Sequence, residues 1–272
     1  MTERPDLDAL PPPAGTPNQP ARDDDYLPQV NWSYGHFALA LLFGIIVGPL
    51  IGLAIYAVLN GQVGDDVPTL FLLAAQVVAS FGVLLFFSKR RGTGNWRTDY
   101  GFALEPRHVW WIGGGMILQI GVALLTFPLV ERFAEDDGPQ QEIARIAAEM
   151  SGAELIIFGV IVAVLTPVFE EIVFRGMLLG RLVKVMSRRW AAVVSAAAFA
   201  AVHLADPNAY LVVPGLFIVG LALANAAYRS KNLSIPIFVH VGVNSLAVLF
   251  LAFADELEDA ADSIESLVRM AL

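Results

Sequence analysis

Long apolar stretches dominate this chain, and short charged or proline- and glycine-containing segments separate them. Several stretches are long enough for an α-helix to cross a hydrocarbon core about 30 Å thick. None shows the alternation of apolar and polar positions that is typical of a transmembrane β-strand. The pattern predicts an all-α, polytopic transmembrane bundle of about seven spans. The predicted spans are residues 33–59, 67–87, 109–130, 153–180, 190–205, 210–228 and 233–253.

The segments outside the spans divide the chain into three parts. Residues 1–31 are rich in proline and aspartate, a composition that predicts a disordered tail. Residues 32–254 form the predicted transmembrane domain, with a short amphipathic helix at 139–150 between the third and fourth spans. Residues 255–272 are acidic and place apolar side chains at helical spacing, which predicts an amphipathic surface helix.

Composition supports a membrane protein and excludes several other classes. The chain of 272 residues is 56% hydrophobic and 16% charged, against about 25% charged in a soluble domain. Its mean hydropathy is +0.62. There is no cysteine, which excludes disulfides, thiol nucleophiles and thiolate metal sites. The net charge of −9 argues against a nucleic-acid partner.

The distribution of basic residues predicts the orientation in the cell membrane. The loops after the second, fourth and sixth predicted spans carry most of the Lys and Arg, and the opposite loops are acidic. Because cytoplasmic loops are enriched in basic residues, the N-terminus is expected in the cytoplasm. An odd number of spans then puts the C-terminus outside. The motif GIIVG at residues 44–48 permits close helix packing without predicting an oligomer.

Six polar residues inside the apolar spans are singled out as candidates, because an ionisable group there costs at least about 2.5–3.5 kcal/mol. The number of residues between each candidate and the nearest basic loop residue, multiplied by the helical rise of about 1.5 Å, gives its depth in the membrane. For Glu170, His203, His240 and Asn244 this depth is roughly 13–21 Å from one edge. Several helices thus deliver polar groups near the bilayer midplane, which predicts one intramembrane site between helices. The six residues are Glu170, Glu171, Arg175, His203, His240 and Asn244.

Spacing in the fourth span separates its two carboxylates. Glu171 and Arg175 are four residues apart with the glutamate first, the favourable order for an ion pair on one helix face. Glu170 is turned by about 100° from Glu171 and has no partner on its own helix. These positions favour Glu170 as a general base and the other two residues as an ion pair.

Spacing in the later spans suggests the remaining roles. Phe199 and His203 are four residues apart, so the phenyl ring can pack along the imidazole. His240 and Asn244 are also four apart, with Gly242 between them allowing close approach of another helix. Two adjacent hydrogen-bond donors suit an oxyanion stabiliser.

The order of these motifs resembles a known family. EEIVFR, FAAVH and HVGVN match E-E-x-x-x-R, F-x-x-x-H and H-x-x-x-N on successive hydrophobic segments. This set resembles the CAAX prenyl protease and bacteriocin-processing (CPBP, Abi) family of intramembrane peptidases, over about residues 150–250. The resemblance implies a multi-pass membrane hydrolase that cleaves a peptide bond in or next to the bilayer. Glu171 and Arg175 would hold the first motif in shape.

The resemblance also implies a mechanism and a substrate. Glu170, assisted by His203, would activate the attacking water, and His240 and Asn244 would stabilise the oxyanion. The implied partners are the lipid bilayer and a membrane-anchored or membrane-proximal peptide. A prenylated C-terminal tetrapeptide, a bacteriocin precursor and a role in self-immunity all remain open as the physiological context.

Two alternatives to the metal-free peptidase remain open. In the first, a zinc-dependent version, Glu171, His203 and His240 would be ligands and water the fourth. The absence of H-E-x-x-H, the location of the histidines on different helices and the nearby Arg175 favour no metal cofactor. In the second, a membrane scaffold or bacteriocin-immunity protein keeps the fold without cleaving. A proton-coupled carrier is disfavoured, because no internal repeat accompanies the charged residues.

Overall fold

The structure is a computed structural model, and it describes residues 28–60, 68–133, 147, 150 and 152–253. The predicted tail is therefore described only from Pro28 onward. The amphipathic helices predicted at 139–150 and 255–272 lie outside the described residues, apart from two isolated positions of the first. The α-helices are α1 (Tyr34–Leu42), α2 (Gly48–Asn60), α3 (Thr69–Arg91), α4 (Trp96–Tyr100), α5 (Trp111–Phe133), α7 (Gly152–Val160), α8 (Thr166–Glu171), α9 (Gly180–Leu182), α10 (Arg188–Val202), α11 (Val213–Ser230) and α12 (Ser234–Ala252).

The helical membrane bundle predicted from the apolar pattern is confirmed. Within the described residues, six helical segments are long and apolar enough to cross a membrane. They are Tyr34–Asn60, Thr69–Arg91, Pro106–Phe133, Gly152–Leu182, Val213–Ser230 and Ser234–Ala252.

The fifth predicted span, 190–205, differs from the prediction in length. It corresponds to α10, which has 15 residues and ends in a 3₁₀ turn at His203–Ala205. At about 1.5 Å per residue, α10 is shorter than a hydrocarbon core of about 30 Å. Whether the chain crosses the membrane an odd number of times therefore stays a prediction. The expected location of the C-terminus outside the cell depends on it.

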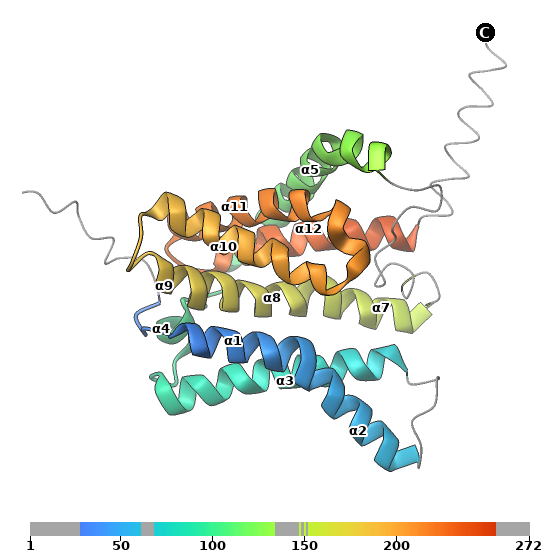
Figure 1. The fold of residues 1–272 in the computed structure, drawn as a ribbon, viewed down its shortest axis with the longest axis horizontal. Coiled ribbons are helices and arrows are strands. Elements are labelled where there is room, and N and C mark those ends of the chain that lie inside the picture. The colour runs from blue at the N-terminus through green and yellow to red at the C-terminus, as the bar shows by residue number, and fades with distance from the viewer. Residues whose placement is uncertain (1–27, 61–67, 134–146, 148–149, 151, 254–272) are drawn as a thin grey trace, which may run out of the picture.

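The segment Gly152–Leu182 lies at the centre of the bundle. Figure 1 shows α7 and α8 between α1 and α3 on one side and α10, α11 and α12 on the other. Two π-helical segments interrupt this span, at Ile161–Leu165 and Ile172–Leu179. All residues of the second segment are buried, so the helix that follows the two glutamates is surrounded by other parts of the protein.

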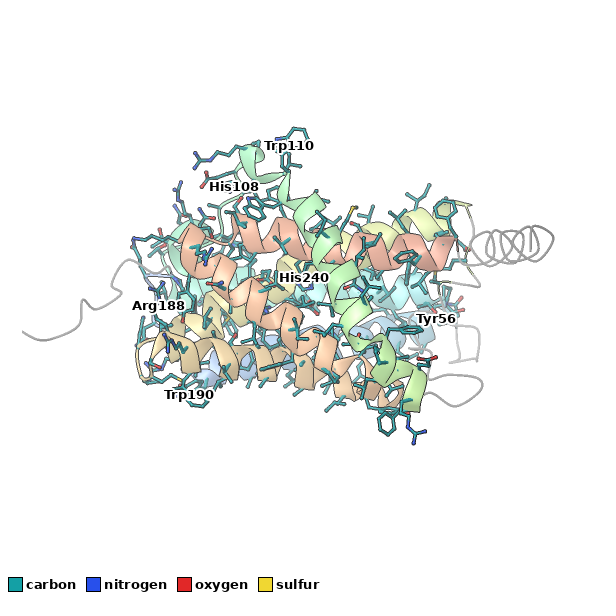
Figure 2. All side chains as sticks on the ribbon, turned by 90° about the horizontal axis from the view of Figure 1, so that it is seen from above. Tyr56, His108, Trp110, Arg188, Trp190 and His240 are labelled. Atoms are coloured by element: carbon teal, nitrogen blue, oxygen red, sulfur yellow. The ribbon has the colours of Figure 1, made fainter. Side chains whose placement is uncertain are left out.

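A glycine contact joins α5 to α12 next to the predicted site. Figure 2 shows α5 passing diagonally across α12. At the crossing with α12, a Cβ on Gly242 would lie 2.0 Å from the Ile112 carbonyl oxygen. A Cβ on Gly115 would similarly lie 1.9 Å from the Val239 carbonyl oxygen. The close approach predicted for Gly242 is therefore present, and the α5 backbone lies against α12 on either side of His240.

A buried aspartate fixes the basic end of the central span. Asp99 in α4 is fully buried and accepts hydrogen bonds from Ser88, from the backbone and hydroxyl of Thr93 and from the Gly94 backbone. Burial alone would raise the pKa of Asp99, but these donors outweigh it and hold that pKa below its usual range. The next residue, Tyr100, is also buried, and its carbonyl lies against Gly176. Asp99 thus holds a turn that packs against Gly176, the residue after Arg175.

Candidate active site

The predicted site residues fall into two groups around one cavity. A cavity of about 370 Å³ lies between α3, α5, α7, α8, α10, α11 and α12. Four of the six predicted residues line it, namely Glu170, His203, His240 and Asn244. Glu171 and Arg175 do not line it and are completely buried behind its wall. Adjacent glutamates on one helix therefore meet different environments, as their 100° separation predicts.

Arg175 connects Glu171 to two other helices. Its Nη1 lies 2.9 Å from Glu171 Oε1, which is the ion pair that the spacing predicts. Its Nη2 donates to the Gly220 carbonyl of α11 at 3.0 Å. Its guanidinium also lies 4.6 Å from the centre of the Phe199 ring, at cation–π distance. Arg175 therefore has partners on α8, α10 and α11.

His240 lies between the two glutamates. Its Nδ1 is 2.9 Å from Glu171 Oε1, and its Nε2 is 3.5 Å from Glu170 Oε2. Because an ionised carboxylate can only accept, Nδ1 is assigned as the donor to Glu171. This hydrogen bond fixes the plane of the ring and directs Nε2 toward Glu170. Only 3% of His240 is exposed, so the ring has little freedom to turn away.

His203 is held at the point where α10 ends. Its Nδ1 is 2.9 Å from the Phe199 carbonyl oxygen, which can only accept a hydrogen bond. Nδ1 is therefore the protonated nitrogen, and Nε2 of the neutral ring is left as an acceptor. The predicted contact with Phe199 is present, with ring centres 5.1 Å apart. Phe199 also contacts His240 at 5.5 Å, so one buried ring supports both histidines.

Asn244 is held by a carbonyl that a proline leaves open. In the first π-helical segment, the Thr166 N–H donates to the Ile161 carbonyl five residues earlier. The next residue is Pro167, which has no N–H to donate to the Val162 carbonyl. Asn244 Nδ2 donates to that carbonyl at 3.0 Å. The sequence predicted only a pairing of Asn244 with His240, and this second role ties α12 to the central span.

Three polar residues that the sequence analysis did not single out also line the cavity. Gln76 comes from α3, Gln119 from α5 and Thr166 from α8. Both glutamines interrupt apolar runs, and an amide in such a run is the signal that could have identified them. The two glutamines show that the second and third spans also contribute to the cavity.

The contacts of Glu171 do not fit the zinc alternative. Glu171 Oε1 already accepts from Arg175 and His240, and the carboxylate is sealed from the cavity that His203 lines. Among the described residues, no three histidine or carboxylate side chains are grouped as a metal site requires. We therefore assign no step of the reaction to a metal ion. The metal-free mechanism stays a prediction.

Comparison with known proteins agrees with the motif analysis. Residues 152–246 match the family model of the type II CAAX prenyl endopeptidase Rce1-like proteins, and this segment contains all six predicted site residues. This match over part of the chain supports the resemblance to the CAAX protease family that the three motifs predicted.

A curated relative also matches the chain. It is a protein of Escherichia coli described as an uncharacterized 24.3 kDa protein, 28% identical over 150 residues. The match covers 52% of this chain and 63% of the relative, which is less than two thirds of its length. No solved structure matches the chain significantly.

Proposed function

We propose that this protein is an intramembrane endopeptidase that hydrolyses a peptide bond with a water activated by Glu170 and His203. One observation carries the proposal. Glu170, His203, His240 and Asn244 come from three different segments of the fold and line a single cavity with largely apolar walls. Polar groups that converge in such a cavity are the expected form of a site that acts within a membrane.

The first step needs a proton acceptor beside the attacking water. Glu170 is only 17% exposed, yet it reaches the cavity, so its carboxylate can accept a proton from a water held there. His203 offers Nε2 as a second acceptor, because Nδ1 is committed to the Phe199 carbonyl. The hydroxide formed adds to the peptide carbonyl carbon. The proton then passes to the leaving amine as the C–N bond breaks.

The tetrahedral oxyanion needs hydrogen-bond donors in place before the reaction. Asn244 has two N–H groups, and Val162 accepts from only one of them, so the other is available to the oxyanion. His240 can donate from Nε2 when its ring carries both protons. The hydrogen bond from Nδ1 to Glu171 fixes the orientation of the ring, and Arg175 holds Glu171 in position. Glu171 and Arg175 are thus positioning residues.

The cavity suits a substrate that is partly embedded in the bilayer. Its walls include Leu73, Phe158 and Val248, which offer apolar contact to a membrane-anchored chain. Gln76 and Gln119 line the same cavity, and each side-chain amide can both donate to and accept from a peptide group. We therefore assign the substrate to the membrane-anchored or membrane-proximal peptides, with a prenylated C-terminal peptide as one class to be tested.

A cleavage assay in liposomes tests the proposal. A panel of membrane-anchored peptides, with and without a prenylated C-terminus, is incubated with the native protein, Glu170→Gln and His203→Ala. Each reaction is run with and without EDTA or phenanthroline, and products are identified by mass spectrometry. We expect cleavage by the native protein, loss of at least about 100-fold in each variant, and no effect of the chelators.

The other outcomes distinguish the alternatives. Loss of cleavage on chelation, restored by added zinc, would overturn the metal-free mechanism. Cleavage that persists in Glu170→Gln at the native rate would remove Glu170 from its role as the base. Binding of peptides from the panel with no cleavage by well-folded native protein would support the scaffold alternative.

A further inference from the structure

A second cavity lies at the basic end of the bundle, away from the candidate active site. It has a volume of about 610 Å³, lies between α10 and α11 and shares no lining residue with the first cavity. Three arginines line it: Arg188 and Arg189 at the start of α10, and Arg229 near the end of α11. Figure 2 shows Arg188 and Trp190 at the same end of the molecule.

The charge of this cavity favours an anionic ligand. No carboxylate occurs among the described residues that line it. Along residues 181–231 the sequence has six Lys and Arg residues, and its one acidic residue, Asp206, follows the opposite end of α10. The cavity also faces the start of α10, whose first backbone N–H groups have no partner within the helix. Arginines beside a helix N-terminus are suited to a phosphate group.

The walls of the cavity hold at least one of these arginines in place. The Arg188 guanidinium lies 4.6 Å from the centre of the Tyr228 ring, and that tyrosine is only 7% exposed. Stacking on a buried ring already restricts the arginine side chain, so less conformational entropy is lost when the arginine binds a ligand. Asn225 adds a neutral donor and acceptor to the same cavity.

The depth of the cavity favours a lipid over a free anion. Leu221 lies eight residues before Arg229, or about 12 Å along α11, and Ala192 lies one turn beyond Arg188. Below them the two helices come into contact, because a Cβ on Gly220 would lie 3.0 Å from Ala196. The cavity is thus a wedge with arginines at its mouth and apolar side chains toward its closed end.

We infer that this wedge binds the headgroup of an anionic phospholipid. The arginines and the α10 N-terminus take the phosphate, and Ala192 and Leu221 contact the glycerol and the first acyl carbons. Basic pockets between transmembrane helices are a recurring way to recognise anionic headgroups. The inference does not depend on the proposed peptidase activity.

Native mass spectrometry of the full chain in detergent tests this inference without any activity assay. The delipidated protein is titrated with dioleoylphosphatidylglycerol or with dioleoylphosphatidylcholine, and the Kd of the first bound lipid is measured. The variant Arg189→Gln/Arg229→Gln removes two charges from the wedge. The control variant Arg91→Gln/Arg97→Gln removes two charges from exposed positions outside the wedge.

We expect one phosphatidylglycerol to bind the native protein and the control with similar Kd. The wedge variant should bind it about tenfold or more weakly, and phosphatidylcholine should bind all three poorly. Equal weakening in both variants would mean that only the overall basic charge matters, which overturns the inference. Displacement of the lipid by millimolar inorganic phosphate would also overturn it, because the site would then take a soluble anion.

Discussion

The ion pair between Glu171 and Arg175 leads to a quantitative prediction about stability. Replacing Arg175 with Met keeps most of the side-chain length but removes the 2.9 Å ion pair and the 3.0 Å hydrogen bond to the Gly220 carbonyl. The Glu171 carboxylate, which has no exposed surface, then keeps His240 as its one hydrogen-bond partner among the described residues. Breaking a buried pair from one side costs about 3–5 kcal/mol. At about 2–4 °C per kcal/mol, we expect a fall of about 6–20 °C in melting temperature.

The double variant Glu171→Gln/Arg175→Met is the matched comparison. It removes both charges, so no uncompensated carboxylate remains, and neutral replacements of buried pairs are often tolerated. We expect it to recover most of the lost melting temperature. Glu170→Gln is a further control, because its side chain is partly exposed and lies 3.5 Å from its closest ionic partner, His240. Its melting temperature should stay within about 2 °C of the native value.

The assay is thermal unfolding in detergent, followed by intrinsic tryptophan fluorescence and by size-exclusion recovery after heating. A native melting temperature for Arg175→Met would refute the reasoning, since the pair would then contribute nothing to the fold. A double variant as unstable as Arg175→Met would show that packing, and not an unpaired charge, causes the loss.

Three further predictions follow from other contacts. Gly242→Ala puts a Cβ 2.0 Å from the Ile112 carbonyl oxygen, so α5 has to move, and we expect the free energy of unfolding to fall by about 1–3 kcal/mol. In the control Gly121→Ala, the new Cβ meets nothing within 4 Å, so the free energy of unfolding should not change. The pKa of Asp99 is lowered in the folded state, so the ionised carboxylate stabilises the fold fully above about pH 4, and this stabilisation is lost as the pH falls through the lower folded pKa. The fall in melting temperature at acid pH should therefore be smaller in Asp99→Asn than in the native protein. Gln76→Leu should raise KM for peptide cleavage with little change in kcat, and an equal fall in kcat with KM unchanged would contradict a role in substrate binding.

The meeting of the motif residues could be predicted because it depends on regular helix geometry. Rise per residue sets depth, and a separation of four residues sets a shared face. Those two rules anticipated the pair of Glu171 with Arg175 and the contact of His203 with Phe199. They also separated the two glutamates, one facing the cavity and the other buried behind it.

The remaining contacts depend on features that a regular helix does not have. The hydrogen bond from Asn244 to Val162 exists because a π-helical register meets Pro167, and that register is not visible in the residue pattern. Gln76 and Gln119 were missed because a neutral amide carries a smaller penalty in lipid than a charge does, and neither glutamine lies four residues from a charged residue or a histidine, as Asn244 does. Their positions on the cavity depend on how α3 and α5 are rotated against the central span, which tertiary packing decides.

The separation of Glu170 from Glu171 has a consequence for chemical labelling. The two carboxyl groups are neighbours in the chain, but only Glu170 is open to the cavity, while Glu171 is sealed and engaged with Arg175 and His240. A small apolar carbodiimide that enters from the bilayer therefore meets Glu170 and not Glu171. Mass-spectrometric mapping of the adduct would identify the accessible carboxyl group, and protection by a bound peptide would turn one residue into a reporter of cavity occupancy.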